Sequence, residues 1–466
     1  MSDKNEWQQN EREMRESFHE KARDLIDQEE RFRKTEGTQL VGIESEVAID
    51  ASNVRPGDLE AVRDSIIEEV GEGADKELGA SQIELRNPKP FDILSNNGFN
   101  ALRKEYADML GALTRATHSR GFSVLMVGAN PFLPIEDTPR TSKPKYVQVP
   151  NFYNTNRGDD VDTLIGLGAR QIDIGFAEVV SLFQSFQVNI EARSCTDAIN
   201  HMNRSFVVAP YLLALCGNAR YLNCVDTHLR DIRMMAWEKS HDTRMQDVRV
   251  LSWERSFDLR TPHEIGTGKM LRVGLPERYF VDMEDYLARA GQFPFILHNP
   301  EAALQIAIGM TWLDARVKFI DDSCVVELRL LPTQPTIREE MVLTLLYIGW
   351  LTDAKIRNGK LLPIECVREN RLSAMMHGMH RPMWFVSNSG APEKLPCDVG
   401  IKREIQNAMY GLRRMGIEHL LDTRFLASMM RHGSPSDRLG KLLEKDGECV
   451  SMERMREALW EAGMLI

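Results

Sequence analysis

The sequence of 466 residues lacks long apolar runs, paired cysteines and an excess of basic side chains. Its longest apolar segment, residues 206–216, has about half of the roughly 20 residues that span a bilayer, and it contains Pro210. The polar first residues do not fit a signal peptide. Seven cysteines occur without a CxxC pair, which is typical of free thiols in a reducing compartment. These absences predict a cytoplasmic protein that does not enter the membrane.

The charge balance is acidic, with 69 Asp and Glu against 58 Lys and Arg. A protein that binds the phosphate backbone of nucleic acids needs clustered basic side chains, so we expect no nucleic-acid partner. A local basic pocket for a phosphorylated ligand is compatible with this balance. The chain also lacks the GxSxG and HExxH motifs, so neither a serine hydrolase nor a zinc protease is indicated.

Periodicity along the chain predicts helices and strands that do not alternate strictly. Residues 1–36 resemble a solvated helical arm with a thin apolar stripe that includes Met14, Phe18 and Leu25. We expect strands at 39–49, 81–85, 122–128, 185–192 and twice within 317–331; helices at 57–71, 95–120, 196–219 and 337–355; and loops over 129–181. The amphipathic strands favour an α+β fold with an antiparallel sheet. The expected units are the arm at 1–36, a core at 37–360 and a mainly helical part at 361–466.

Several expected strands carry polar residues at alternate positions within apolar sequence. Side chains that are two residues apart on a strand face the same way. The pairs are Glu44 with Glu46, Gln82 with Glu84, Gln187 with Asn189, and Glu327 with Arg329. Each pair alone is more typical of a solvated sheet face. If the polar sides share one cavity, however, at least four carboxylates converge there.

Converging carboxylates need a cation. Two carboxylates about 4 Å apart repel by roughly 1 kcal/mol in water, and by several times more inside a protein. Glutamate and amide oxygens favour a hard ion such as Mg²⁺ or Mn²⁺. A metal pocket with arginine nearby is also suited to phosphoryl transfer.

The strings that carry these pairs resemble one enzyme family. GIESEVAI (42–49), SQIEL (81–85), FQVNIEA (186–192) and CVVELR (324–329) are similar to motifs of the glutamate–cysteine ligases, in the plant-type and bacterial carboxylate–amine ligase branch. VLMVGANP (124–131) and ENRLSAMMHGM (369–379) fit the same motif order. Asn218, Arg233 and Trp237 also keep the family's spacing. The resemblance runs from about residue 40 to 380.

The resemblance implies a glutamine-synthetase-like α+β fold, in which a curved, mostly antiparallel sheet with flanking helices lines the active site of the 37–360 core. It implies that ATP activates the γ-carboxylate of glutamate as an acyl phosphate, which the amino group of cysteine then attacks, as in glutathione biosynthesis. The implied partners are these small molecules, and a homodimer is possible. The implied site residues are Glu44, Glu46, Glu84, Gln187 and Glu327 for Mg²⁺ or Mn²⁺, Arg233 and Arg329 for catalysis, and Asn189, Arg316 and Asn218 for substrate or nucleotide.

Two departures from the family pattern leave the acceptor open. The loop after the 196–219 helix reads GNAR at 217–220, and Pro332 stands where an acidic residue is common. These departures favour the same chemistry with another amine. A third interpretation is a non-catalytic homologue that binds nucleotide or a partner through the 1–36 arm. The four glutamates and two arginines of the site favour catalysis over that interpretation.

Overall fold

The structure is a computed structural model that describes residues 2–34 (side chains from residue 9), 37–136, 138–157, 162–241, 273–292, 295–352 and 360–466. Its centre is an eight-stranded sheet in which every pairing is antiparallel. The strands are β1 (Leu40–Asp50), β2 (Ala74–Lys76), β3 (Gln82–Arg86), β4 (Phe91–Asp92), β5 (Ser123–Leu125), β8 (Phe186–Ala192), β13 (Ala315–Ile320) and β14 (Ser323–Leu328).

The strand order is β13-β14-β8-β1-β3-β2, and β4 and β5 also pair with β1. The sheet is curled into a half-barrel. Along β1, buried residues such as Val41, Ile43 and Val47 alternate with half-buried Glu44 and Glu46. One face of the sheet is therefore apolar, and the other presents the polar pairs. The predicted α+β class with a curved antiparallel sheet is confirmed.

Helices surround this sheet. They are α1 (Ser2–Asp27), α2 (Leu59–Val70), α3 (Gly98–His118), α4 (Pro144–Asn156), α5 (Cys195–Cys216), α6 (Arg233–Ser240), α8 (Met283–Ala290), α9 (Ala303–Gly309), α10 (Ile337–Leu351), α12 (Ile364–His377), α13 (Cys397–Arg414), α14 (Thr423–His432), α15 (Pro435–Leu442) and α16 (Met452–Glu461). Two-stranded pairs are β6 (Leu164–Ile165) with β7 (Ile172–Asp173), β9 (Tyr221–Leu222) with β10 (Val225–Asp226), β11 (Val273–Gly274) with β12 (Trp312–Leu313), and β15 (Met383–Val386) with β16 (Pro392–Leu395).

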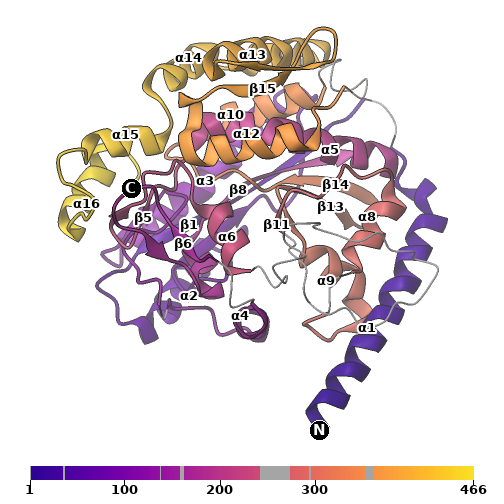
Figure 1. Ribbon diagram of the computed structural model, residues 1–466, viewed down its shortest axis with the longest axis horizontal. Coiled ribbons are helices and arrows are strands. Elements are labelled where there is room, and N and C mark those ends of the chain that lie inside the picture. Colours follow the sequence, from indigo (N-terminus) through magenta and orange to yellow (C-terminus); the bar gives the residue numbers. More distant parts are fainter. Residues whose placement is uncertain are drawn as a thin grey trace.

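The apolar face of the sheet is covered by α5, which packs on β8, β13 and β14. Helices α10 and α12 pack on α5, and α13 packs on α10, so the helices are stacked away from the sheet (Figure 1). Almost every residue of α5 from Ala198 to Cys216 is buried, which explains its continuous apolar sequence. In the described part of the chain, no helix is long and apolar enough to cross a membrane.

The prediction of loops throughout 129–181 is wrong at α4. Tyr146, Pro150 and Tyr153 of this helix are buried, at the spacing of one helix face. Pro144 stands at the start of the helix, where its missing N–H costs nothing. The density of Pro and Asn in this stretch concealed the short helical pattern. The expected strand at 122–128 is also shorter, since β5 covers only Ser123–Leu125.

The N-terminal helix α1 is helical as predicted, but one of its faces is not solvated. Met14, Phe18 and Leu25 are buried in the main core, and α1 packs against α8 and α9. Figure 1 shows α1 lying along these two helices at the edge of the molecule. No observation tests the predicted boundaries of the three units, which remain a prediction.

Candidate active site

A cavity of about 390 Å³ lies against the polar face of the sheet. Its other walls come from α4, α6, α9 and the segments next to them. Seven of the ten predicted site residues line it: Glu44, Glu46, Glu84, Gln187, Arg233, Arg316 and Arg329. The remaining three, Asn189, Asn218 and Glu327, are not among the lining residues.

Strand register explains why these residues meet. Glu46 of β1 is directly opposite Glu84 of β3, and Glu44 is opposite Gln187 of β8. On the other side of β8, Asn189 is opposite Glu327 of β14. Side chains that are directly opposite on neighbouring strands lie on the same face of a sheet. The alternation seen in the sequence thus becomes one continuous polar surface.

Carboxylates gather at one side of the cavity. Burial, with repulsion from neighbouring Glu77, raises the pKa of Glu46 to about 7, although Arg233 and the Ser185 bonds act in the opposite direction. Burial also raises the pKa of Glu84 well above its usual range, with added repulsion from Glu44, Glu77 and Glu46. These carboxylates therefore lack enough positive charge around them.

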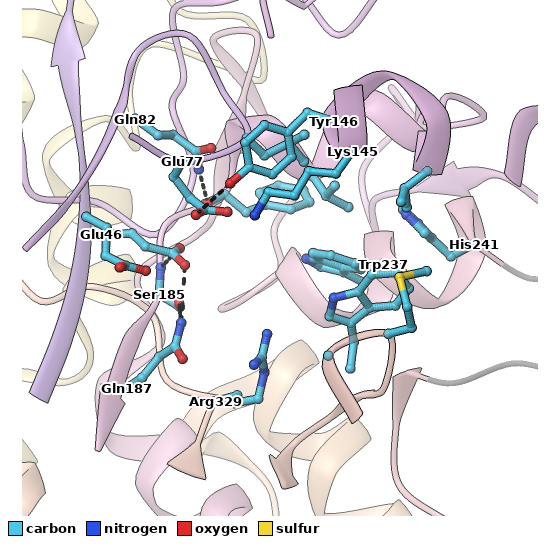
Figure 2. A pocket seen from close by; sticks show the side chains of 18 of the residues that line it. Glu46, Glu77, Gln82, Lys145, Tyr146, Ser185, Gln187, Trp237, His241 and Arg329 are labelled. Atoms are coloured by element: carbon cyan, nitrogen blue, oxygen red, sulfur yellow. Dashed lines mark hydrogen bonds between the residues drawn. The ribbon is translucent and has the colours of Figure 1, made fainter. Parts of the chain in front are cut away.

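Glu77 is a site residue that the sequence did not reveal. It lies just beyond β2 and outside any alternating strand, so no periodic signal marked it. The Tyr146 hydroxyl donates to its Oε2 atom at 3.3 Å (Figure 2). Burial raises the pKa of Glu77, which the nearby Lys145 ammonium only partly offsets. Both Lys145 and Tyr146 come from α4, the helix missed in the sequence.

Cations gather around Glu327, which is fully buried. Its carboxylate contacts Arg316 and Arg329, the latter at 2.6 Å, and it also pairs with Lys318. Burial opposes ionisation, but these three cations outweigh it and hold the pKa of Glu327 well below its usual range. The structure therefore places Glu327 among positive charges, and Lys318 links it to Glu44, which its Nζ contacts at 3.0 Å.

Arg233 stands at the start of α6, and its side chain reaches the cavity. One of its Nη atoms donates to the Leu330 carbonyl at 3.1 Å, while its buried Nε has no partner among the residues that the structure describes. An unpartnered buried donor of this kind is costly unless a ligand satisfies it. The geometry is suited to an anionic group of a substrate.

The opposite wall of the cavity is apolar and aromatic. Trp237 and His241 follow Arg233 at intervals of one helical turn, and Figure 2 shows them across the cavity from Glu46 and Glu77. The ring centres of Trp237 and Trp312 are 4.9 Å apart, and those of Trp237 and His241 are 4.8 Å apart. Burial lowers the pKa of His241 to about 3, with a contribution from Arg157. This imidazole is neutral at physiological pH.

The two asparagines have structural contacts. Asn189 donates to Glu44 at 3.1 Å, and its buried Oδ1 has no partner. Asn218 is buried and donates to the carbonyls of Met126 and Thr333, at 3.0 and 2.7 Å. The amide of Asn218 thus joins the chain after α5 to two neighbouring segments.

The donor chemistry fits a hard divalent cation, although the side chains are not yet arranged around one. Glu46, Glu77 and Glu84 offer carboxylate oxygens with raised pKa values, and the Oε1 atom of Gln187 is buried without a partner. Within the described residues, no three His, Cys, Asp or Glu side chains stand close enough to hold one ion. Binding would require these carboxylates to rotate toward one another.

Comparisons with known proteins give one family model that matches the chain and solved structures that share its fold. The model of Glutamate-cysteine ligase family 2 (GCS2) matches residues 32–388. A glutamate–cysteine ligase from Francisella tularensis in complex with AMP has 11% identity and a TM-score of 0.53, over 93% of this chain and 89% of that chain. A bifunctional glutathione synthetase from Pasteurella multocida has 11% identity and a TM-score of 0.51, over 91% of this chain and 53% of that one. No curated protein matches the sequence. The predicted glutamine-synthetase-like architecture is confirmed.

Proposed function

This chain belongs to glutamate-cysteine ligase family 2, and on that premise we propose that it uses ATP to join the γ-carboxylate of glutamate to the amino group of cysteine. The family resemblance predicted from the sequence is confirmed. One observation of the cavity carries the proposal furthest. Its polar wall is divided into an acidic half, with Glu46, Glu77 and Glu84, and a basic half around Arg316 and Arg329.

This division suits the electrostatic problem of the reaction. A glutamate carboxylate and the triphosphate of ATP are both anions, so their approach requires positive charge on both. Three cations surround the carboxylate of Glu327, and one of them, Lys318, also pairs with Glu44 at 3.0 Å, which leaves a net positive charge of one on that half of the site. Arg233 adds a further positive charge, and its Nε has no hydrogen-bond partner among the described residues.

We assign the chemistry as two displacements. A γ-carboxylate oxygen of glutamate attacks the γ-phosphorus of ATP, the bond from that phosphorus to the β–γ bridging oxygen breaks, and ADP leaves. The amine nitrogen then attacks the acyl carbon, the carbon–oxygen bond breaks, phosphate leaves and the nitrogen loses its proton. Arg329 and Arg316 would stabilise the charge on the transferred phosphoryl group, and Arg233 would hold a substrate carboxylate.

Divalent cations belong to this proposal through the acidic half. We assign Glu46, Glu77 and Glu84, with the Gln187 amide oxygen, as the donors for Mg²⁺ or Mn²⁺, and Glu44 stands next to them on β1. A bound ion would neutralise phosphate charge. Glu327 is assigned instead to holding Arg316 and Arg329 in place. In the same way, the contacts of Asn189 support a role in orienting Glu44.

The two departures from the family pattern have structural uses away from the cavity. Arg220 pairs with Asp226 through two bonds of 2.7 Å, and Pro332 packs against Gly128, where an added Cβ would lie 2.6 Å from it. Neither Arg220 nor Pro332 lines the cavity. Cysteine therefore remains the first proposed acceptor. The apolar wall with Trp237 favours, as a second candidate, an amine with an apolar side chain.

The test is ADP release by the purified protein with ATP, Mg²⁺ and glutamate, with each amino acid added singly as acceptor and the products identified by mass. We expect ADP release that depends on cysteine and a γ-glutamylcysteine product. Release with an apolar amino acid alone would establish the second candidate. An Arg329→Met variant is the control for contaminating activity. Nucleotide binding without ADP release for any acceptor would overturn the ligase proposal and favour a binding role.

A further inference from the structure

The N-terminal helix α1 places an ion pair inside the protein. Glu11 and Arg15 are one helical turn apart, pair with each other, and are only 1% and 4% exposed. The whole of α1 precedes the family match, which begins at residue 32. The motifs of the active site therefore do not explain this pair.

The pair faces a short stretch of chain that lies between α8 and α9. The Oε2 atom of Glu11 accepts a hydrogen bond from the backbone N–H of Phe295 at 2.7 Å. An Nη atom of Arg15 donates to the Gly291 carbonyl at 2.6 Å. Two residues further along α1, the Ser17 hydroxyl donates to the Pro300 carbonyl at 2.5 Å. Three polar side chains of one helix thus bind the backbone of one stretch.

Apolar contacts reinforce the same attachment. The Phe18 ring fills the space beside Gly291, where an added Cβ would lie 2.4 Å from the ring. The ring centres of Phe18 and Phe295 are 6.0 Å apart. Met14 is fully buried, and its sulfur accepts from the backbone N–H of Asn299 at 3.1 Å. The helix cannot shift along this stretch without breaking several of these contacts.

The stretch held by α1 continues directly into the cavity wall. Leu297 lines the cavity, and so do Ile306 and Gly309 of α9, followed by Met310 and Trp312. Helix α9 itself packs on α1 (Figure 1). The contacts of α1 with Phe295, Asn299 and Pro300 therefore reach the cavity through residues 295–312, which the structure describes throughout.

The energetics favour a positioning role over simple stabilisation. A buried ion pair recovers little net stability, because both ions lose their hydration, and apolar side chains of similar size would often serve as well. Burial raises the pKa of Glu11 even though Arg15 is beside it. The pair does, however, form hydrogen bonds to two backbone groups, the Phe295 N–H and the Gly291 carbonyl, which apolar side chains could not form.

We propose that α1 is a brace for the cavity wall formed by residues 297–312, and that Glu11 and Arg15 are positioning residues for the substrate that lies against this wall. The kinetic part of this inference rests on the proposed function. The wall touches bound substrate away from the reacting atoms, so its displacement should weaken binding in the ground state and transition state equally. Such a loss raises KM and leaves kcat unchanged.

The test compares Glu11→Ala with Glu11→Gln in the full chain. Glu11→Ala should raise the KM of one substrate at least tenfold with kcat within about threefold of wild type. Glu11→Gln should restore most of that loss, because the amide oxygen still accepts from the Phe295 N–H. Ser17→Ala, a milder change on the same helix, should raise the same KM by a smaller factor. A fall in kcat without a change in KM would overturn the proposal.

Asp226→Ala is the matched control. Asp226 is also buried, pairs with Arg220, accepts from the backbone N–H of His228 at 2.7 Å, and does not line the cavity. This variant should lower stability and leave every KM unchanged. If both variants raise the same KM, the effect is general destabilisation and the brace is excluded.

Hydrogen exchange tests the brace without any activity. In Glu11→Ala, the amides of residues 303–313 should exchange at least tenfold faster than in wild type, while those of β8 keep the wild-type rate. An unchanged rate at 303–313, or equal acceleration in β8, would overturn the brace. Absence of ligase activity in the wild-type protein would overturn the proposed function alone, because the exchange result would still decide the role of α1.

Discussion

Replacing Glu46 by glutamine removes one negative charge from the acidic half of the cavity and keeps the shape of the side chain. The glutamine oxygen can still accept from the Ser185 backbone N–H, which is 2.7 Å from Oε2 of Glu46. The charge is lost, and with it the repulsion from Glu77 and Glu84, the smaller attraction of Arg233, and the bond that Gln187 Nε2 donates to Oε1 at 3.2 Å. We therefore expect Glu46→Gln to stabilise the protein in the absence of divalent cations.

The magnitude follows from the pKa. A carboxyl whose pKa rises from 4.5 to about 7 is destabilised in its ionised form by about 3 kcal/mol, at about 1.4 kcal/mol for each factor of ten in acidity. Below pH 4.5 the Glu46 carboxyl is protonated in both the folded and the unfolded state, so removing its charge does not change the free energy of unfolding. Between pH 4.5 and 7 the folded state binds more protons, and wild-type stability falls as pH rises. The stability difference between Glu46→Gln and wild type is largest above pH 7, where Glu46 is ionised in both states.

Urea denaturation at pH 4 and pH 8, with a chelator present, measures this difference. The variant should match wild type at pH 4 and exceed it by up to about 3 kcal/mol at pH 8. Added Mg²⁺ should stabilise wild type more than the variant, and so reduce the difference. A variant that is less stable than wild type at pH 8 would refute the reasoning, because it would show that ionised Glu46 is already compensated.

Three further predictions concern other parts of the cavity. Arg329→Met should lower kcat of the proposed ligase reaction by about 10²- to 10³-fold, as measured by ADP release, and a normal kcat would exclude its role at the phosphoryl group. Glu327→Ala removes the carboxylate partner of Arg316 and Arg329, while Lys318 keeps Glu44, and it should lower the free energy of unfolding by about 3–5 kcal/mol in urea; an unchanged value would contradict the pairing. The pKa of His241 is about 3 in the folded protein and about 6.5 in the unfolded chain. As pH falls from 6.5 to 3, the unfolded state therefore binds a proton that the folded state does not, and the free energy of unfolding of wild type decreases. His241→Phe should remove that loss, and its denaturation curve should converge with wild type above pH 7.

The period-two pattern predicted much of the site because strand geometry is local. Alternation alone places Glu44 and Glu46 on one face, and pairing with β3 and β8 then brings Glu84 and Gln187 beside them. Motif order identified the family, which the match over residues 32–388 confirms. Predictions that no observation tests, including the cytoplasmic location, the homodimer and the unit boundaries, stay predictions.

Other features depend on contacts between distant segments. Glu77 belongs to the acidic half because the segment after β2 contacts α4 through Tyr146. The alternation of residues along a single strand does not predict such a contact between distant segments. The family resemblance implied a metal-ligand role for Glu327, whereas the antiparallel pairing of β13 with β14 brings Arg316 and Lys318 beside it, and Arg329 follows on its own segment.

The sequence by itself determined the family, the strands of the polar face and most of the charged residues of the cavity, because these depend on residue type and short-range periodicity. The tertiary structure decided which charges neutralise one another, which carboxylates are left in need of a cation, and how α1 attaches to the cavity wall. Those outcomes depend on burial and on distances between segments hundreds of residues apart, as for Glu11 and Phe295. Electrostatic interactions strengthen several-fold where water is excluded, so the same side chains acquire their roles only in the folded chain.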